Sequence, residues 1–130
     1  MREFSRRMNA NLSRPEPGRS APAAQQQAAV VQSADEIVKI STEAEHKLSA
    51  LHPPAAFREV HTARLAFFHS LAATNSAWKQ ELLHGNAETQ NRALKRMGTE
   101  GMTARKRIAE AMQRAAPKSA MLRVSGDRAR

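Results

Sequence analysis

The chain has 130 residues, a net charge of +9 at pH 7 and no cysteine. The missing cysteine excludes disulfides, thiolate metal sites, iron–sulfur clusters and cysteine nucleophiles. Leu, Ile, Val and Phe together make up 21 of 130 residues, or about 16%. This fraction is below the ~20% level under which charged chains tend to stay disordered. We therefore expect one all-α domain with a thin core, and no β-sandwich or barrel, because β-branched and aromatic residues are scarce.

The first 21 residues are rich in Arg, Ser, Pro and Asn and contain few apolar side chains. This composition predicts a disordered basic arm over residues 1–21. Ser5-Arg6-Arg7 resembles the start of a twin-arginine export signal, but the apolar stretch that such a signal needs does not follow. No apolar run in the chain reaches the ~18 residues of a membrane span. We therefore expect a cytoplasmic location.

A first helix is predicted over about residues 23–51, followed by a turn at Pro53 and Pro54. Apolar residues recur along one face every seven positions, at Val30, Ile37, Ala44 and Leu51. Ser33 and Glu36 also fit a capping box, which would start the helix at Ala34. Two starts, one before and one after residues 22–33, therefore stay open.

A second helix is predicted over about residues 55–84, where thirty residues contain no Pro or Gly. Its apolar stripe holds Phe57, Val60, Leu65, Phe68, Leu71, Ala72, Trp78, Leu82 and Leu83. Three polar residues, His61, Arg64 and Asn75, fall inside the stripe and form a candidate buried polar site. Such a site could be a ligand pocket or a pH-sensitive contact. The alternative is a histidine held by a local acceptor, with the arginine extending outward.

A third helix is predicted over about residues 87–116, with Gly85 in the left-handed conformation before it, Asn86 as its cap and Pro117 after it. Its apolar residues recur at alternating intervals of three and four, which is the pattern of a coiled-coil seam. Gly98 and Gly101 either bend or divide this helix, and we favour one bent helix. Short connections predict an antiparallel up-down-up three-helix bundle over residues 22–116, with a basic tail over 117–130.

The third predicted helix also carries a basic face. Residues 86–130 have a net charge of +7. Six cations project within about 120° of arc opposite the seam, at 100° per residue. They are Arg92, Lys95, Arg96, Lys106, Arg107 and Arg114. A row of cations binds phosphates without reading sequence, so we expect this helix to dock on nucleic acid or another polyanion. The alternative is a solvated face that keeps the protein soluble.

Catalytic patterns are missing from the sequence. It contains no phosphate-binding glycine loop, nucleophile elbow or Ser/His/Asp arrangement, so we expect a protein without enzymatic activity or a cofactor. Two Glu-x-x-His pairs, Glu43 with His46 and Glu81 with His84, have the spacing found in di-iron bundles. The predicted hairpin places them at opposite ends, where they cannot share a metal. We therefore expect no metal site.

A protein–protein function is the alternative to nucleic-acid docking. The chain contains six methionines, many alanines and an apolar seam that is only partly filled. A bundle with such a core can complete it by pairing with a protein partner or with a second copy of itself. The sequence does not choose between these partners.

Three short motifs resemble a known group of domains. Leu48, Leu51 and Pro53-Pro54 are followed by His61 early in the next helix and then by Leu82-Leu83-x-Gly85-Asn86. Over about residues 34–112 the chain resembles small helical-bundle domains of uncharacterised bacterial proteins, many of them envelope lipoproteins. The resemblance implies a helical bundle and no defined activity. The chain departs from that group by its missing lipidation cysteine and by its basic third helix.

Overall fold

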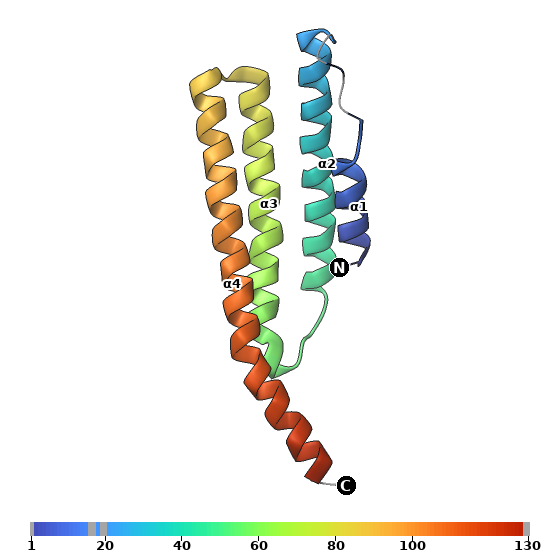
Figure 1. The fold of residues 1–130 in the computed structure, drawn as a ribbon, viewed down its shortest axis with the longest axis vertical. Coiled ribbons are helices and arrows are strands. Elements are labelled where there is room, and N and C mark those ends of the chain that lie inside the picture. Colours follow the sequence, from blue (N-terminus) through green and yellow to red (C-terminus); the bar gives the residue numbers. More distant parts are fainter. Residues whose placement is uncertain (1, 16–17, 19–20, 129–130) are drawn as a thin grey trace.

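The computed structural model describes residues 2–15, 18 and 21–128, with side chains up to residue 116. All elements in these residues are helical, so the predicted all-α class is confirmed. They are α1 Arg2–Leu12, α2 Ala23–Ser49, the 3-10 helix η1 Ala55–Phe57, α3 Arg58–His84 and α4 Ala87–Arg128. Figure 1 shows the three long helices running alongside one another, with the short α1 against α2.

The predicted three-helix bundle with a disordered N-terminal arm is wrong, because Arg2–Leu12 forms a fourth helix. The Phe4 ring packs edge-on against Phe68 of α3, with 4.8 Å between ring centroids and 71° between ring planes. A single buried aromatic contact thus gives α1 a place in the core. Composition alone could not reveal it, since the partner ring lies 64 residues away in the sequence.

Charged side chains hold the rest of α1 against α2. Their contacts are Lys47 Nζ to Glu3 at 2.9 Å, Arg7 to Glu43, Arg14 to Glu36, and Asn11 Nδ2 to Glu36 Oε2 at 3.0 Å. Asn11 is 5% exposed, and its Oδ1 accepts a hydrogen bond from the Ser33 hydroxyl at 2.8 Å. The arginines that predicted a disordered arm are therefore part of what orders it.

The three long helices begin close to where the sequence predicts. α2 starts at Ala23, the earlier of the two predicted starts, so residues 22–33 join the helix. It ends at Ser49, four residues before Pro53, and α3 follows directly on η1. Proline fixes φ and disfavours a helical residue before it, which is why this connection is extended.

The connection between α3 and α4 consists of Gly85 and Asn86. Asn86 Oδ1 accepts the Thr89 N–H at 3.0 Å, and Thr89 Oγ1 accepts the Asn86 N–H at 3.0 Å, so the predicted cap is confirmed. Gly85 is extended, with φ −91° and ψ −176°, and its predicted left-handed conformation is wrong. Close approach explains the glycine instead, because a Cβ there would lie 2.7 Å from the Glu81 carbonyl oxygen.

α4 is one helix that passes through Gly98, Gly101 and Pro117 to Arg128, so its predicted end at residue 116 is wrong. A proline inside a helix removes one backbone hydrogen bond, but it does not always end the helix. The last turns of α4 project beyond the other helices (Figure 1). The glycines do not divide the helix, so of the favoured single bent helix the single helix is confirmed and the bend stays a prediction.

The buried core is small and rich in alanine, as the composition predicts. Among the described residues, five of the eight buried hydrophobic side chains are alanines. Val60 and Ala63 of α3 pack with Ala111 and Ala115 of α4. Small side chains at this contact let the two helix backbones approach closely.

Candidate functional site

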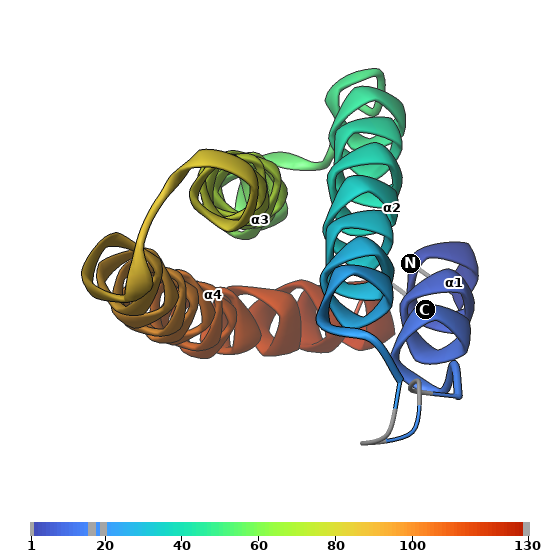
Figure 2. The ribbon, with the colours of Figure 1, turned by 90° about the horizontal axis from the view of Figure 1, so that it is seen from above.

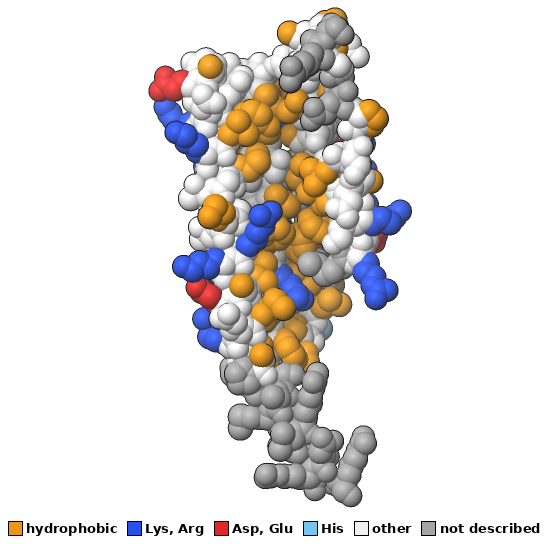
Figure 3. Space-filling model, in the orientation of Figure 1, with side chains coloured by type: hydrophobic (Ala, Val, Ile, Leu, Met, Phe, Trp, Pro, Cys, Tyr) orange, Lys and Arg blue, Asp and Glu red, His pale blue; other side chains and the backbone are white. Residues whose placement is uncertain are grey.

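An open groove runs between α2 and α4. Both helices pack against α3, but among the described residues no α-carbon of α2 lies within 8 Å of one in α4. Figure 2 shows α2 and α4 on two sides of α3, seen from above. Figure 3 shows a band of hydrophobic side chains along the space between them. We call this space, with α3 as its floor and α2 and α4 as its walls, the groove.

Near the α2–α3 connection the groove forms a hollow of about 680 Å³, which we call its wide end. Three of its large apolar side chains are well exposed: Leu51 at 59%, Phe57 at 39% and Met112 at 50%. The remaining walls are Leu48, His52, Pro53, Val60, His61, Arg64, Ala115 and Ala116. The charged and titratable groups here are all basic. Exposed apolar side chains that gather in one hollow mark a surface for a partner.

A strip of α4 borders the groove next to the alanines that pack on α3. Helical spacing places Leu94, Gly98, Gly101, Arg105 and Met112 along this strip. Leu94 is 45% exposed, and a Cβ added at either glycine would meet nothing within 4 Å. The glycines therefore serve no close helix approach within the chain. The sequence pattern indicated an apolar seam that is only partly filled, but it did not single out this strip.

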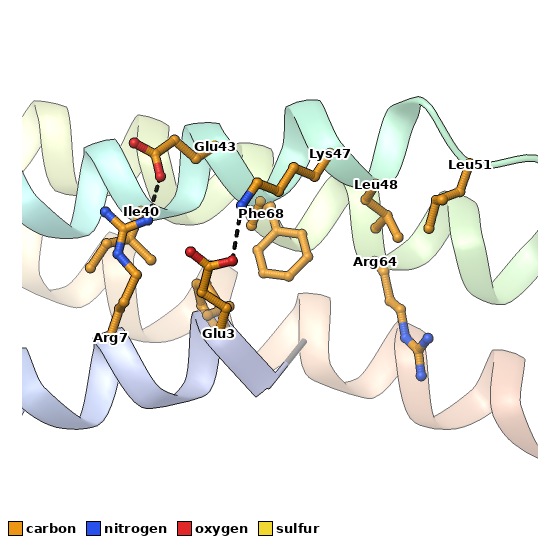
Figure 4. A pocket seen from close by; sticks show the side chains of 11 residues that line it. Glu3, Arg7, Ile40, Glu43, Lys47, Leu48, Leu51, Arg64 and Phe68 are labelled. Carbon is orange, nitrogen blue, oxygen red and sulfur yellow. Dashed lines mark hydrogen bonds and ion pairs between the residues drawn. The ribbon is translucent and has the colours of Figure 1, made fainter.

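A smaller hollow of about 320 Å³ lies beneath α1. Figure 4 shows its ion pairs: Glu3 with Lys47, and Arg7 with Glu43. Arg64 borders both this hollow and the groove. The other charged side chains that line the hollow beneath α1 are paired with one another, whereas Arg64 forms no ion pair with a described residue.

The predicted basic face exists on α4, and all six of its cations are exposed. Four of them form ion pairs: Arg92 with Glu88 at 3.1 Å, Arg96 with Glu100 at 2.8 Å, Lys106 with Glu110 at 3.9 Å, and Arg114 with Glu59 at 2.5 Å. Lys95 and Arg107 form no ion pair with a described residue. Acidic side chains therefore neutralise much of the predicted basic face.

These ion pairs also shift the titration of their members. The Arg96 guanidinium donates a hydrogen bond to Glu100 and holds the pKa of that carboxyl below its usual range. The Glu59 carboxylate accepts a hydrogen bond from Arg114 and raises the pKa of that guanidinium. Both pairs are therefore fully charged at neutral pH.

The three residues of the predicted buried polar site do not form one site. His61 and Arg64 are half-buried and share the wide end of the groove. Asn75 is 3% exposed and donates from Nδ2 to the Leu71 carbonyl oxygen at 2.8 Å, within its own helix. It lies eleven residues from Arg64, or about 16 Å along α3 at 1.5 Å per residue.

Charge is distributed unequally over the part of the chain whose side chains are described. Eight of the ten acidic side chains there form ion pairs with Lys or Arg, Glu45 lies 3.3 Å from His69, and Glu81 has no such partner. Eight basic side chains there have no such partner: Arg2, Arg6, Lys39, Arg58, Arg64, Lys95, Arg105 and Arg107. The unmatched charge of the described residues is therefore almost entirely positive.

The described residues contain neither a cluster of three or more potential metal ligands nor a helix that could span a membrane. No group of three or more His, Asp or Glu side chains there could hold a metal ion. Of the two Glu-x-x-His pairs, the first has its Glu43 carboxylate engaged by Arg7. Among the described helices, none combines the length and the hydropathy needed to cross a bilayer.

Comparisons of the chain with protein-family models, with curated proteins and with solved structures find no match. The resemblance to bacterial helical-bundle domains therefore stays a prediction. The function must be argued from the groove and the charges alone.

Proposed function

We propose that the chain is a non-enzymatic helical module that binds another protein by accepting one of its helices in the groove. The observation that carries the proposal is that α2 and α4 both pack on α3 without meeting. Four-helix bundles fill such a position with a further helix. Binding an amphipathic helix in an apolar groove is also a recurring mode of protein recognition.

Exposed apolar area supplies the driving force for this binding. Leu51, Phe57 and Met112 come from three different parts of the chain and converge on one hollow. Burial of apolar surface contributes roughly 25 cal/mol per Å². A helix lying along the groove would cover all three side chains at once.

The proposal is tested with a fluorophore at a single introduced cysteine, which is possible because the chain has none of its own. Met112→Cys places an environment-sensitive dye at the groove, and Thr62→Cys places it on the exposed outer side of α3. The probe is a peptide of about 20 residues with a helical leucine stripe and glutamine elsewhere. We expect a saturable blue shift from the groove dye only. No saturable change at Met112→Cys contradicts the proposal.

A second candidate function is docking on nucleic acid or another polyanion through the basic face. It is favoured by the +7 net charge of residues 86–130 and by the two unmatched cations Lys95 and Arg107. Titration with a generic DNA duplex should show affinity falling ~10- to ~1,000-fold between ~50 and ~200 mM salt. Lys95→Gln with Arg107→Gln should weaken binding more than Arg2→Gln with Arg6→Gln. Equal binding by both double variants counts against the α4 face.

A further inference from the structure

We infer that the helix accepted by the groove is acidic: an amphipathic helix of another protein, with Asp or Glu beside its apolar stripe, whose carboxylates pair with Arg64 and Arg105. The inference rests on the proposed function and gives the chemistry of the partner. It is carried by the charges that the groove presents and by the acids that the chain has already used.

Arg64 supplies the first of these charges. Its side chain rises from α3, is half-buried, and borders the wide end of the groove. The nearby carboxylates of Glu3 and Glu43 are engaged by Lys47 and Arg7, as Figure 4 shows. A helix that covered Arg64 without a counter-charge would leave a guanidinium buried and unpaired, which is costly.

Arg105 supplies the second charge. It lies seven residues before Met112, on the α4 strip that borders the groove, and it forms no ion pair with a described residue. Packing of Ala63 with Ala111 sets the register of the two antiparallel helices. In this register Arg64 and Arg105 lie about 8 Å apart along the groove, at 1.5 Å per residue. Carboxylates four residues apart on one helix face, about 6 Å, can reach both arginines.

Among the side chains described, few acids are left to answer these arginines. Eight of the ten pair with Lys or Arg, Glu45 lies 3.3 Å from His69, and Glu81 has no such partner. A second copy would bring the same groove and another net charge of +9. Basic side chains interrupt the hydrophobic band of Figure 3, and no acidic side chain is visible within it. Charge complementarity therefore favours an acidic partner over self-association.

The test uses the full chain and three peptides that share one leucine stripe and differ only in the residues beside it, which are Glu, Gln or Lys. We expect the Glu peptide to bind about tenfold more tightly than the Gln peptide at ~100 mM salt, and the Lys peptide to bind most weakly. Arg64→Gln with Arg105→Gln should remove most of the preference for Glu, measured as the ratio of the affinities for the Glu and Gln peptides. Neither arginine forms an ion pair with a described residue, so the far-ultraviolet circular dichroism of this variant should match the wild type.

The matched control is Arg58→Gln with Arg107→Gln. It removes the same charge from two unmatched arginines that line a separate hollow with Glu59, Glu110 and Arg114. The control should change affinity for the Glu peptide by less than about threefold, as exposed charges do. An equal loss in both double variants assigns the preference to net charge and overturns the inference.

Three further outcomes separate the inference from the proposed function. Equal affinity of the wild type for the Glu and Gln peptides overturns the acidic partner and leaves helix binding intact. Failure of all three peptides to shift the groove dye overturns the proposed function as well. A peptide-free mass by light scattering that doubles with concentration, and reverts with Met112→Gln, assigns the groove to a second copy and overturns the inference.

Discussion

Two contacts in this molecule are built from opposite chemistry. α1 and the residues just after it are held on α2 by three ion pairs and an asparagine, and on α3 by one aromatic ring. α4 is held on α3 by small apolar side chains, with Ala111 at 1% and Ala115 at 4% exposure. The first contact depends mainly on which groups are ionised, whereas the second is mainly apolar and includes one ion pair, between Glu59 and Arg114. Solution conditions that change ionisation should therefore weaken α1 docking more than the α3–α4 hairpin.

Phe68 of α3 receives the aromatic ring of α1, and its replacement should give the largest effect. It is 1% exposed and contacts Phe4 of α1 and Phe67 of its own helix. Phe68→Ala should lower the free energy of unfolding by about 3–5 kcal/mol, measured by urea denaturation, because it leaves a cavity in a thin core. Phe57→Ala is the control, and its loss should be less than half as large, since Phe57 is 39% exposed.

Ala111→Leu tests the apolar contact by overfilling it. The side chain packs with Val60, Ala63 and Ala115, and the helices must separate to admit a leucine. We expect a loss of about 1–3 kcal/mol in thermal unfolding, in the range of other overpacked cores. The exposed Ala109 provides the matched control on the same helix, where leucine should cost almost nothing. Equal effects at the two positions would contradict close packing between α3 and α4.

Ser41→Ala should stabilise the buried core. Ser41 is 0% exposed, and its hydroxyl has no hydrogen-bond partner among the described residues. Removal of an unsatisfied buried hydroxyl should raise the free energy of unfolding by about 1 kcal/mol. Ser76→Ala, on the exposed side of α3, gives the gain due to helix propensity alone. A gain at Ser41 no larger than at Ser76 would mean that the hydroxyl is satisfied in solution.

Acid should release α1 before it affects the rest, and this is the smallest expected effect. The pKa values of three carboxyls at the α1–α2 contact lie below their usual range, because each accepts a hydrogen bond from a cation. They are Glu3 with Lys47, Glu36 with Arg14, and Glu43 with Arg7. Because the pKa of each carboxyl is lower in the folded state, its ionisation stabilises the contact fully above the unfolded-state value of about 4.3. This stabilisation is lost as the pH falls through the folded-state pKa.

Hydrogen exchange measures this release. Protection factors of residues 2–12 should fall below about pH 4, whereas those of the α3–α4 hairpin should not. High salt at neutral pH should act in the same direction by screening the ion pairs. Loss of protection in both regions at the same pH would contradict independent docking of α1. The Glu43→Gln variant should show reduced α1 protection already at pH 7.

Much of the fold could be predicted from sequence because its signals are local. Apolar spacing, Pro53-Pro54 and the Gly85-Asn86 cap locate α2, α3 and the start of α4 to within a few residues. α1 could not be predicted in this way. Arg7 of α1 pairs with Glu43, 36 residues away, and Lys47 pairs with Glu3 of α1, 44 residues away. These ion pairs therefore exist only after the chain has folded.

In the candidate site, too, local features could be predicted and contacts between helices could not. The six cations of α4 could be placed on one face, and the acids Glu88, Glu100 and Glu110 that pair with them at i±4 were also visible in the sequence. The pairing of Arg114 with Glu59 was not, because it joins two helices. The groove was missed because an apolar stripe shows that a face needs cover, but not whether another helix of the chain provides it.

The short connection at Gly85 and Asn86 favours early folding of α3 and α4 as a hairpin. Local contacts in helical hairpins form on the microsecond to millisecond scale, before long-range ones. α3, against which both α2 and α4 pack, is complete only when residue 84 has been synthesised. During translation the N-terminal helices therefore precede the surface that holds them. We expect the second half of the chain to act as the template on which the first half is finally assembled.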